Sequence, residues 1–401
     1  MCYGHINFNE IKKHKMEAYM NFTGYKFEGK TLASLSVGCM RFPNRQAAEE
    51  IISTCVKNNA VYLDTSPGYC YQSEEENCET WVGSAIKGIR DKVILSAKCA
   101  TGNGGDKIGN YDPAHGFSIT TESEVRKQIE QSLKRLNVDS LDFYQLWAVH
   151  NYPLYEVALK KGGWLDGVLK AKDEGLLKHI GFTGHIGSDD IIKVIDNSNF
   201  EMITIPFNIM DNSRLKAVKY AREKNIAVVM MNPLAGGILG ENGNEAILGM
   251  LKKVGEDSLQ GMSLSYCAAF NSSALSGMSS NEQALHNVEV FSKPLIDDEK
   301  ASLYKKELES VLHHESFKCT SCGYCTPCPQ GINIPEVLRM RNNYLIFGLQ
   351  DAKNRLKNAY KSDAGFRVEN CTECGLCESK CPNGVNTIEL LKDALKIRNE
   401  A

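Results

Sequence analysis

Eight of the chain's 15 cysteines fall into two short runs near its C-terminal end. The runs read CTSCGYCTPCP at residues 319–329 and CTECGLCESKCP at residues 371–382. A C-x2-C-x2-C spacing lets three thiolates converge on one small inorganic centre, because tight turns return every third side chain to the same side. Each run then adds a fourth cysteine before a proline. Two such runs predict two 4Fe-4S clusters.

The fourth cysteine of each run suggests how the ligands are shared. In the two-cluster ferredoxin pattern, the cysteine before the proline ligates the other cluster. One cluster is then expected on Cys319, Cys322, Cys325 and Cys381, and the second on Cys371, Cys374, Cys377 and Cys328. The first run is one residue shorter before Cys328, which departs from that pattern. The alternative is a pair of four-cysteine zinc sites, which normally use two widely separated C-x2-C pairs.

A second group of reactive side chains lies in the first 150 residues: Asp64, Tyr69, Lys98 and His150. A lysine ammonium paired with a carboxylate is expected to lower the pKa of a nearby phenol, which would let Tyr69 donate and accept a proton. A histidine can orient a carbonyl oxygen by hydrogen bonding. Taken singly, each residue could be structural, with Asp64 and Lys98 forming a buried ion pair. Their combination favours proton transfer at a carbonyl or an alcohol.

Eight strand-like runs alternate with amphipathic helices and could bring this second group together. The runs are LSVGC, VYLDT, KVILSAK, LDFYQLW, HIGFTG, MITIPFN, IAVVMMN and SALSG. Eight βα units between residues 31 and 292 match a (β/α)8 TIM barrel of ~250 residues. In such a barrel the loops after the strands share one cavity. A doubly wound sheet is the alternative, but no G-x-G-x-x-G follows the first strand.

Local signals mark the helices and the domain organisation. Thr121 with Glu124 predicts a capping box, and Ser188 is expected to cap the helix DDIIKVIDNS. Helical spacing between the cysteine runs predicts a helical insertion. We therefore expect an N-terminal extension and hairpin at 1–30, a barrel at 31–295 and a small α-helical ferredoxin-like domain at 296–401.

Several stretches resemble the aldo-keto reductases, specifically the branch with a C-terminal ferredoxin-like domain carrying two 4Fe-4S clusters. The stretches are YLDTSPGY, ILSAK, LDFYQLWAVH, IGFTGH, NPLAGG and GMSSNEQ, and the resemblance covers residues 24 to 390. It implies that Asp64, Tyr69, Lys98 and His150 form the catalytic tetrad. The separations of five and 29 residues from Tyr69 to Asp64 and Lys98 match the family. Tyr69 would be the general acid/base.

The resemblance also implies a nicotinamide cofactor, NAD(P)(H). Residues expected to contact it are Thr183, Asn232, Ser279, Ser280, Gln283 and Asn287. Three family anchors are altered: Gly184 follows Thr183, Thr204 replaces a glutamine, and Met231 stands where an aromatic ring would stack. Met278 and Ala284 replace basic residues that often bind the 2'-phosphate, so NAD is slightly favoured over NADP.

The segment after the third strand, residues 101–120, is longer than a usual βα loop of about 2 to 6 residues. We expect it to overhang the cavity, with Tyr111, His115 and Trp147 as candidate substrate contacts. The alternative is that these three side chains are structural and only pack against the long loop. Trp164 and His185 are weaker candidates.

Composition limits the remaining possibilities. With 46 basic and 49 acidic residues, the chain has no basic surface that would favour nucleic acid. The N-terminus lacks a signal-peptide core, and the most apolar run is broken by Asn232 and Pro233, so we expect no membrane span. Clustered cysteines favour a reducing compartment and a cytoplasmic location, with the other seven cysteines as apolar fillers.

Three functions remain open from the sequence. The first is a carbonyl or alcohol oxidoreductase acting on a small molecule with a nicotinamide. The second is an electron-transfer protein whose barrel serves as a docking module, with a possible redox partner protein. The third is a barrel that has lost its cofactor. A hydride carries two electrons and each cluster carries one, and no flavin signature is present to mediate between them.

Overall fold

The barrel expected from the sequence is present in the computed structural model, which describes residues 20–98, 121–149, 152–240, 244–312, 319, 321–381 and 383–400. Parallel strands close in the order β10-β3-β4-β5-β6-β7-β8-β9. Their bounds are β3 Leu35–Gly38, β4 Tyr62–Asp64, β5 Ile94–Lys98, β6 Leu141–Val149, β7 Leu177–Gly184, β8 Met202–Pro206, β9 Ala227–Met231 and β10 Ser273–Gly277. This order brings β4 and β5, which end in Asp64 and Lys98, side by side.

Helices cover the outside of the barrel. They are α1 Arg45–Lys57, α2 Cys78–Ala85, α3 Glu122–Leu136, α4 Tyr152–Ala158, α5 Trp164–Asp173, α6 Ser188–Asp196, α7 Leu215–Glu223, α8 Glu245–Val254, α9 Leu259–Ala268 and α10 Asn281–Ser292. The capping box of Thr121 and Glu124 is confirmed. The expected cap at Ser188 is wrong, because Gly187 is the N-cap residue and the Ser188 hydroxyl instead donates to the Ser213 carbonyl at 3.0 Å.

A β-hairpin closes the N-terminal end of the barrel. Its strands are β1 Phe22–Phe27 and β2 Lys30–Ala33, which pair antiparallel. Tyr25, Phe27 and Leu32 are buried against side chains from the barrel interior, among them Phe143. With apolar residues filling this end, a ligand can reach the barrel interior from the C-terminal ends of the strands, where chemistry belongs in this fold.

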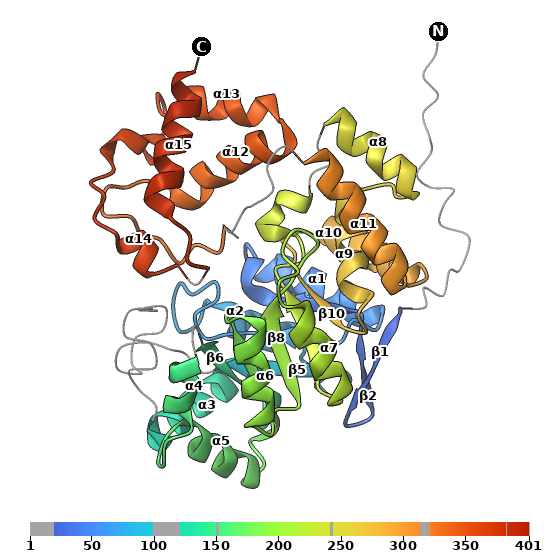
Figure 1. Ribbon diagram of the computed structural model, residues 1–401. Coiled ribbons are helices and arrows are strands. Elements are labelled where there is room, and N and C mark those ends of the chain that lie inside the picture. Colours follow the sequence, from blue (N-terminus) through green and yellow to red (C-terminus); the bar gives the residue numbers. More distant parts are fainter. Residues whose placement is uncertain are drawn as a thin grey trace.

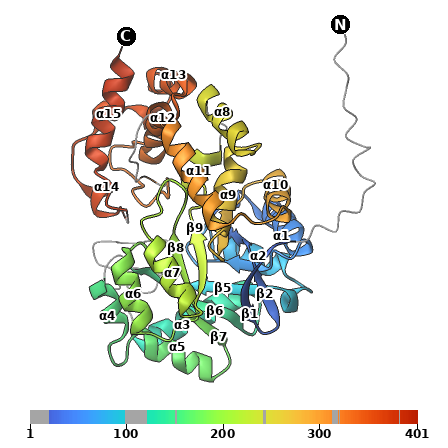
Figure 2. The same cartoon turned by 45° about the vertical axis from the view of Figure 1, so that its right-hand side comes forward.

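The helical insertion between the cysteine runs is confirmed as α12 Ile334–Phe347 and α13 Gln350–Ala359, followed by α14 Leu376–Ser379 and α15 Thr387–Asn399. These helices share a separate small core that includes Val337, Leu356 and Leu391. Figures 1 and 2 show α12, α13 and α15 together at one end of the molecule, far from the β1–β2 hairpin.

The helix α11, Asp298–Val311, joins the barrel to this smaller unit. Ala301, Tyr304 and Leu308 belong to the barrel's apolar core, and Ile346 and Phe347 from the end of α12 pack into the same core. The two units therefore share an apolar contact. Within the described part of the chain, no helix combines the length and apolar character needed to cross a bilayer.

Candidate active site and cluster sites

A buried ion pair forms the floor of the candidate site. Asp64 and Lys98 are each only 2% exposed. The Lys98 ammonium contacts the Asp64 carboxylate and also donates to the Thr65 carbonyl at 2.9 Å. Because a buried charge is tolerated only when it is paired and hydrogen-bonded, each member of this pair depends on the other.

Gln145 on β6 holds the other oxygen of the same carboxylate. Its amide Nε2 donates to Asp64 Oδ1 at 2.9 Å, and its Oε1 accepts from the Thr204 hydroxyl at 2.7 Å. Since side chains alternate along a strand, Phe143, Gln145 and Trp147 all point into the barrel. The sequence analysis did not identify Gln145. The signal that could have done so is a polar residue at a strand position whose side chain faces the barrel interior.

Tyr69 lies in the loop after β4, beside the ion pair. Its ring centroid is 5.0 Å from Lys98 Nζ. Burial, reinforced by the Asp64 carboxylate and nearby cysteine thiols, raises the pKa of Tyr69 well above its ordinary value. The net lowering of this pKa expected from Lys98 is therefore not found, because burial and the Asp64 carboxylate outweigh the ammonium charge. Tyr69 is held as a neutral phenol, a form that can donate a proton.

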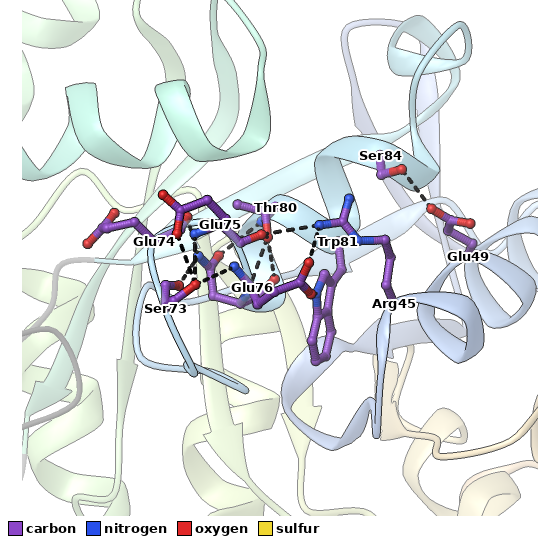
Figure 3. Close-up of polar contacts among 10 residues, drawn as sticks. Arg45, Glu49, Ser73, Glu74, Glu75, Glu76, Thr80, Trp81 and Ser84 are labelled. Carbon is purple, nitrogen blue, oxygen red and sulfur yellow. Dashed lines mark hydrogen bonds and ion pairs between the residues drawn. The ribbon is translucent and has the colours of Figure 1, made fainter.

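The loop that carries Tyr69 is fixed at its far end by polar contacts, shown in Figure 3. The Glu76 carboxylate accepts from Trp81 Nε1 at 2.6 Å and from Arg45 Nη2 at 2.8 Å. Asn77 and Thr80 form a capping box at the start of α2. The amide of Cys78 also donates to the Tyr69 carbonyl at 3.0 Å. These contacts hold the phenol in place over the ion pair.

A cavity of about 390 Å³ opens above the ion pair at the C-terminal ends of the strands. It is lined by Asp64, Tyr69 and Lys98, and also by Thr183, Asn232, Ser279 and Gln283 from the expected cofactor contacts. The structure thus gathers three of the four proposed tetrad residues with four polar residues from β7, from the loops after β9 and β10, and from α10. His150, Tyr111 and His115 lie outside the described residues.

Two further cofactor candidates make internal contacts. Ser280 caps α10 by accepting from the Gln283 amide at 3.4 Å. Asn287 is 1% exposed, donates to Ser276 Oγ and accepts from Gln260 Nε2, each at 2.9 Å. Neither Ser280 nor Asn287 is among the residues that line the cavity.

The aromatic candidates divide between the cavity and the core. Trp147 and His185 line the cavity. Trp164 is fully buried among Tyr144 and Phe200 in the outer layer, away from it. Burial, together with the Arg214 charge, lowers the pKa of His185 to about 4, while a bond to Asn383 opposes this shift. His185 is therefore neutral near neutral pH.

Several cavity residues were not expected there from the sequence, and Arg41, Cys322 and Tyr324 are the most informative of them. Arg41 follows β3, whereas Cys322 and Tyr324 come from the first cysteine run. Arg41 lies in an ordinary βα loop and carries no motif. For Cys322 and Tyr324 the sequence contains no signal at all, because nothing in the chain's pattern states which face of the barrel the cysteine-rich unit covers.

The eight cysteines line two neighbouring small cavities. Cys319, Cys322, Cys325 and Cys381 line the first, and Cys328, Cys371, Cys374 and Cys377 line the second, with Cys325 at the wall between them. The fourth cysteine of each run thus lies with the triplet of the other run. Among the described residues, no three His, Cys, Asp or Glu side chains converge as the ligands of a single metal ion would.

The chemistry of these cavities suits a cluster. Burial raises the pKa of Cys319 to about 11 and that of Cys325 to about 12, and neighbouring thiols add to both shifts. Thiols crowded away from water cannot ionise together unless a bound cation balances them. The iron of a 4Fe-4S cluster would supply that positive charge, so the residues present fit the group.

Comparisons with known proteins agree with both the barrel and the cysteine-rich unit. A family model described as the Aldo/keto reductase family matches residues 34–307, and a model described as a 4Fe-4S dicluster domain matches residues 318–386. L-galactose dehydrogenase of Arabidopsis thaliana is 27% identical over 57% of this chain and 72% of its own length. The NADH-specific methylglyoxal reductase of Escherichia coli is 25% identical over 49% of this chain and 59% of its own length.

Other relatives and solved structures extend this picture. The uncharacterised oxidoreductase YqkF of Bacillus subtilis is 25% identical over 52% of this chain, but only 63% of its length is matched. The aldo-keto reductase AKR11C1 of Bacillus halodurans, in its holo form, has a TM-score of 0.57 at 23% identity, over 72% of this chain and 96% of its own. A Klebsiella pneumoniae aldo/keto reductase in complex with NADP and acetate has a TM-score of 0.55 at 17% identity, over 71% and 95%. At these identities the likeness shows the fold.

Proposed function

Because the chain belongs to the aldo/keto reductase family and carries a 4Fe-4S dicluster domain, we propose that it interconverts a carbonyl and an alcohol on a small molecule with a nicotinamide cofactor. One observation carries this proposal. Tyr69, held as a neutral phenol beside the Asp64–Lys98 pair, opens into the same cavity as Thr183, Asn232 and Ser279. Proton donor and expected cofactor contacts thus share one space.

In the reducing direction, Tyr69 would give its proton to the carbonyl oxygen as that oxygen becomes an alcohol. When bound, the reduced nicotinamide supplies the hydride that the carbonyl carbon takes up. The Lys98 ammonium would then stabilise the resulting phenolate by electrostatic attraction, and Gln145 would keep Asp64 oriented while this charge appears. His150 would orient the substrate oxygen. In its neutral resting state Tyr69 already carries the proton that carbonyl reduction requires.

The charge of the cavity supports binding of an anionic cofactor. Its described cationic lining residues are Lys98 and Arg41, and its acidic one is Asp64. Since Lys98 is balanced by Asp64, Arg41 contributes the net positive charge, which would attract a pyrophosphate. Met278 and Ala284 are buried and apolar near the adenosine end, which favours NAD over NADP. Ser279 and Gln283, which line the cavity, are the proposed contacts there, whereas Ser280 and Asn287 would act only by supporting cavity residues.

For the clusters, we propose the crossed ligation. Cys319, Cys322, Cys325 and Cys381 would hold cluster I, and Cys371, Cys374, Cys377 and Cys328 would hold cluster II. These thiolates would bind a group that carries one electron at a time. An electron-transfer role with an external redox partner is the second candidate. It is favoured by Cys322, because a ligand of cluster I is also a wall of the barrel cavity.

Anaerobic isolation followed by metal analysis and cofactor titration tests the proposal. We expect about eight iron and eight sulfide per chain, together with a change in protein fluorescence when NADH or NADPH is added. A chain that binds both clusters but neither dinucleotide would favour the electron-transfer role. Two zinc ions in place of iron would overturn the cluster assignment.

A further inference from the structure

Part of the wall of the barrel cavity comes from the iron–sulfur unit. Cys322 and Tyr324 line this cavity together with Tyr69 and Trp147. Cys322 and Cys325 also line the cavity assigned to cluster I. The short loop from Cys322 to Cys325 therefore separates the two cavities, and Tyr324 is the large side chain that it presents to the barrel.

Trp147 connects Tyr324 to the proton donor. Its ring meets the Tyr69 ring edge-on, with centroids 6.2 Å apart. Its side chain also hydrogen-bonds Tyr324, and since an indole can only donate, the Tyr324 hydroxyl oxygen accepts. Three aromatic rings thus run from the expected reaction centre to the cluster loop. A ligand bound at Tyr69 therefore shares its cavity with the rings of Trp147 and Tyr324.

Polar contacts on both sides fasten this wall to the barrel. Arg41 Nη2 donates to the Ser321 carbonyl at 3.2 Å. On the other side, His185 Nδ1 and Asn383 Oδ1 are 2.9 Å apart. Ser321 precedes Cys322, and Asn383 lies two residues after Cys381. Both contacts therefore fix chain next to ligands of cluster I, which holds Tyr324 at a defined distance from Tyr69.

We propose that Tyr324 is a specificity-determining residue, supplied by the iron–sulfur unit, that contacts the substrate and limits its size. Apolar residues that line the same cavity include Met40, Leu234 and Leu275. The substrate class is therefore a carbonyl compound with a small apolar substituent, whose size the Tyr324 ring limits while the carbonyl oxygen faces Tyr69. This inference rests on the proposed carbonyl reduction.

The test changes the size of residue 324 in opposite directions. Steady-state kinetics are measured with a short aliphatic aldehyde and with an aryl aldehyde, using wild type, Tyr324→Ala and Tyr324→Trp. We expect the aryl-to-aliphatic ratio of kcat/KM to rise at least about 10-fold in Tyr324→Ala and to fall by a similar factor in Tyr324→Trp. A merely structural residue would lower both rates together, so an unchanged ratio in both variants overturns the proposal.

Two controls separate local from global effects. Tyr344→Phe alters another tyrosine of the same unit, whose hydroxyl accepts from Lys353 at 3.2 Å and which does not line the barrel cavity. Its ratio should stay within about twofold of wild type. Iron and sulfide content is measured for every variant. If Tyr324→Ala loses iron, the comparison of Tyr324→Trp with Tyr324→Phe, which keeps the ring, still tests the size limit.

Failure of the proposed function can be told from failure of this inference. If the wild-type chain oxidises neither NADH nor NADPH, the carbonyl reduction is wrong. Equilibrium binding of the same two aldehydes is then followed by tryptophan fluorescence, because Trp147 lies in the cavity. Tyr324→Ala and Tyr324→Trp must still shift the ratio of the two dissociation constants in opposite directions. Equal shifts for both aldehydes overturn the inference independently of any chemistry.

Discussion

The barrel site and the cysteine-lined cavities use opposite means to hold reactive groups. In the barrel, Asp64 and Lys98 lie on adjacent strands, Gln145 donates a further hydrogen bond to Asp64, and the Thr65 carbonyl accepts one from Lys98. In the iron–sulfur unit, Cys377 lies in α14 and the other seven cysteines lie outside helices, and together they line two small cavities. The first site is built by the fold itself. The second needs a bound inorganic group to balance its charges.

Removal of iron should expose this difference most strongly. We expect anaerobic chelation to abolish hydrogen-exchange protection in residues 319–400, because a small helical core is left around unpaired thiols, while α1 to α10 keep their protection. Hydrogen exchange with mass spectrometry measures both regions in one sample. Equal loss of protection in the barrel would show that the two units do not differ in this way.

Single cysteine changes sharpen the same comparison. Cys381→Ser should remove cluster I, held by the triplet of the other run, and leave cluster II in place, so iron content falls by about half. Electron paramagnetic resonance of the reduced protein should then show one cluster signal. Cys267→Ser, at a fully buried position in the barrel, is the control that should keep both clusters. Loss of cluster II instead would show that each run holds its own cluster.

On the barrel side, the largest effect should come from breaking the buried ion pair. Lys98→Met leaves the Asp64 carboxylate buried without its cation, so we expect the unfolding free energy to fall by about 3–5 kcal/mol. Denaturant unfolding followed by tryptophan fluorescence measures this change. Adding Asp64→Asn should recover part of the loss. No loss in Lys98→Met would mean that Asp64 is protonated when alone.

Tyr69→Phe should separate chemistry from structure. The change deletes one hydroxyl, so fold, clusters and dinucleotide affinity should persist while turnover falls by roughly 100-fold or more. Stopped-flow oxidation of reduced nicotinamide gives the rate, and fluorescence titration gives the affinity. Because the raised pKa keeps Tyr69 protonated, the wild-type rate of carbonyl reduction should not fall at alkaline pH below the ordinary tyrosine value of about 10. A wild-type rate in Tyr69→Phe would move the chemistry away from this residue.

The smallest effect concerns the contact between the two units at His185. Its pKa is lowered to about 4 in the folded chain, against about 6.5 when unfolded. Below the unfolded value, the unfolded chain takes up a proton that the folded chain refuses, so stability should decline as pH falls from about 6.5 to about 4. In His185→Gln the decline in stability between these two pH values should vanish. An unchanged slope would mean that other groups cause it.

The barrel site and the iron–sulfur unit also differ in how far their positions could be predicted from the sequence. The strand ends and the spacing of Asp64, Tyr69 and Lys98 are local features of the sequence. In a barrel, the order of the strands is enough to place these residues next to one another. The pKa of Tyr69 could not be predicted, because it depends on how closely Lys98 is paired with Asp64 and on burial. The position of Tyr324 could not be predicted either, since docking of the cysteine-rich unit is set by contacts between residues far apart in the chain, such as Arg41 with Ser321.

The repeated cysteine spacing, by contrast, predicted tight turns, and the two runs have matching backbone. Ser321 and Gly323 flank Cys322 with φ values of 49° and 85°, and Glu373 and Gly375 flank Cys374 with 56° and 75°. The same left-handed turn is thus built twice. Left-handed φ is unfavourable for Ser321 and Glu373, so these turns are conformations that cluster binding would help to retain.

The shared wall of the barrel cavity has a consequence for synthesis of the chain. Domains fold in the order in which they leave the ribosome, so the barrel can fold before Cys371 has been translated. At that stage Tyr324 has no cluster I to hold it, because Cys381 is still missing. The newly made enzyme would therefore have a complete proton donor and an open cavity. Its selectivity would be acquired last, when the cell delivers iron and sulfide.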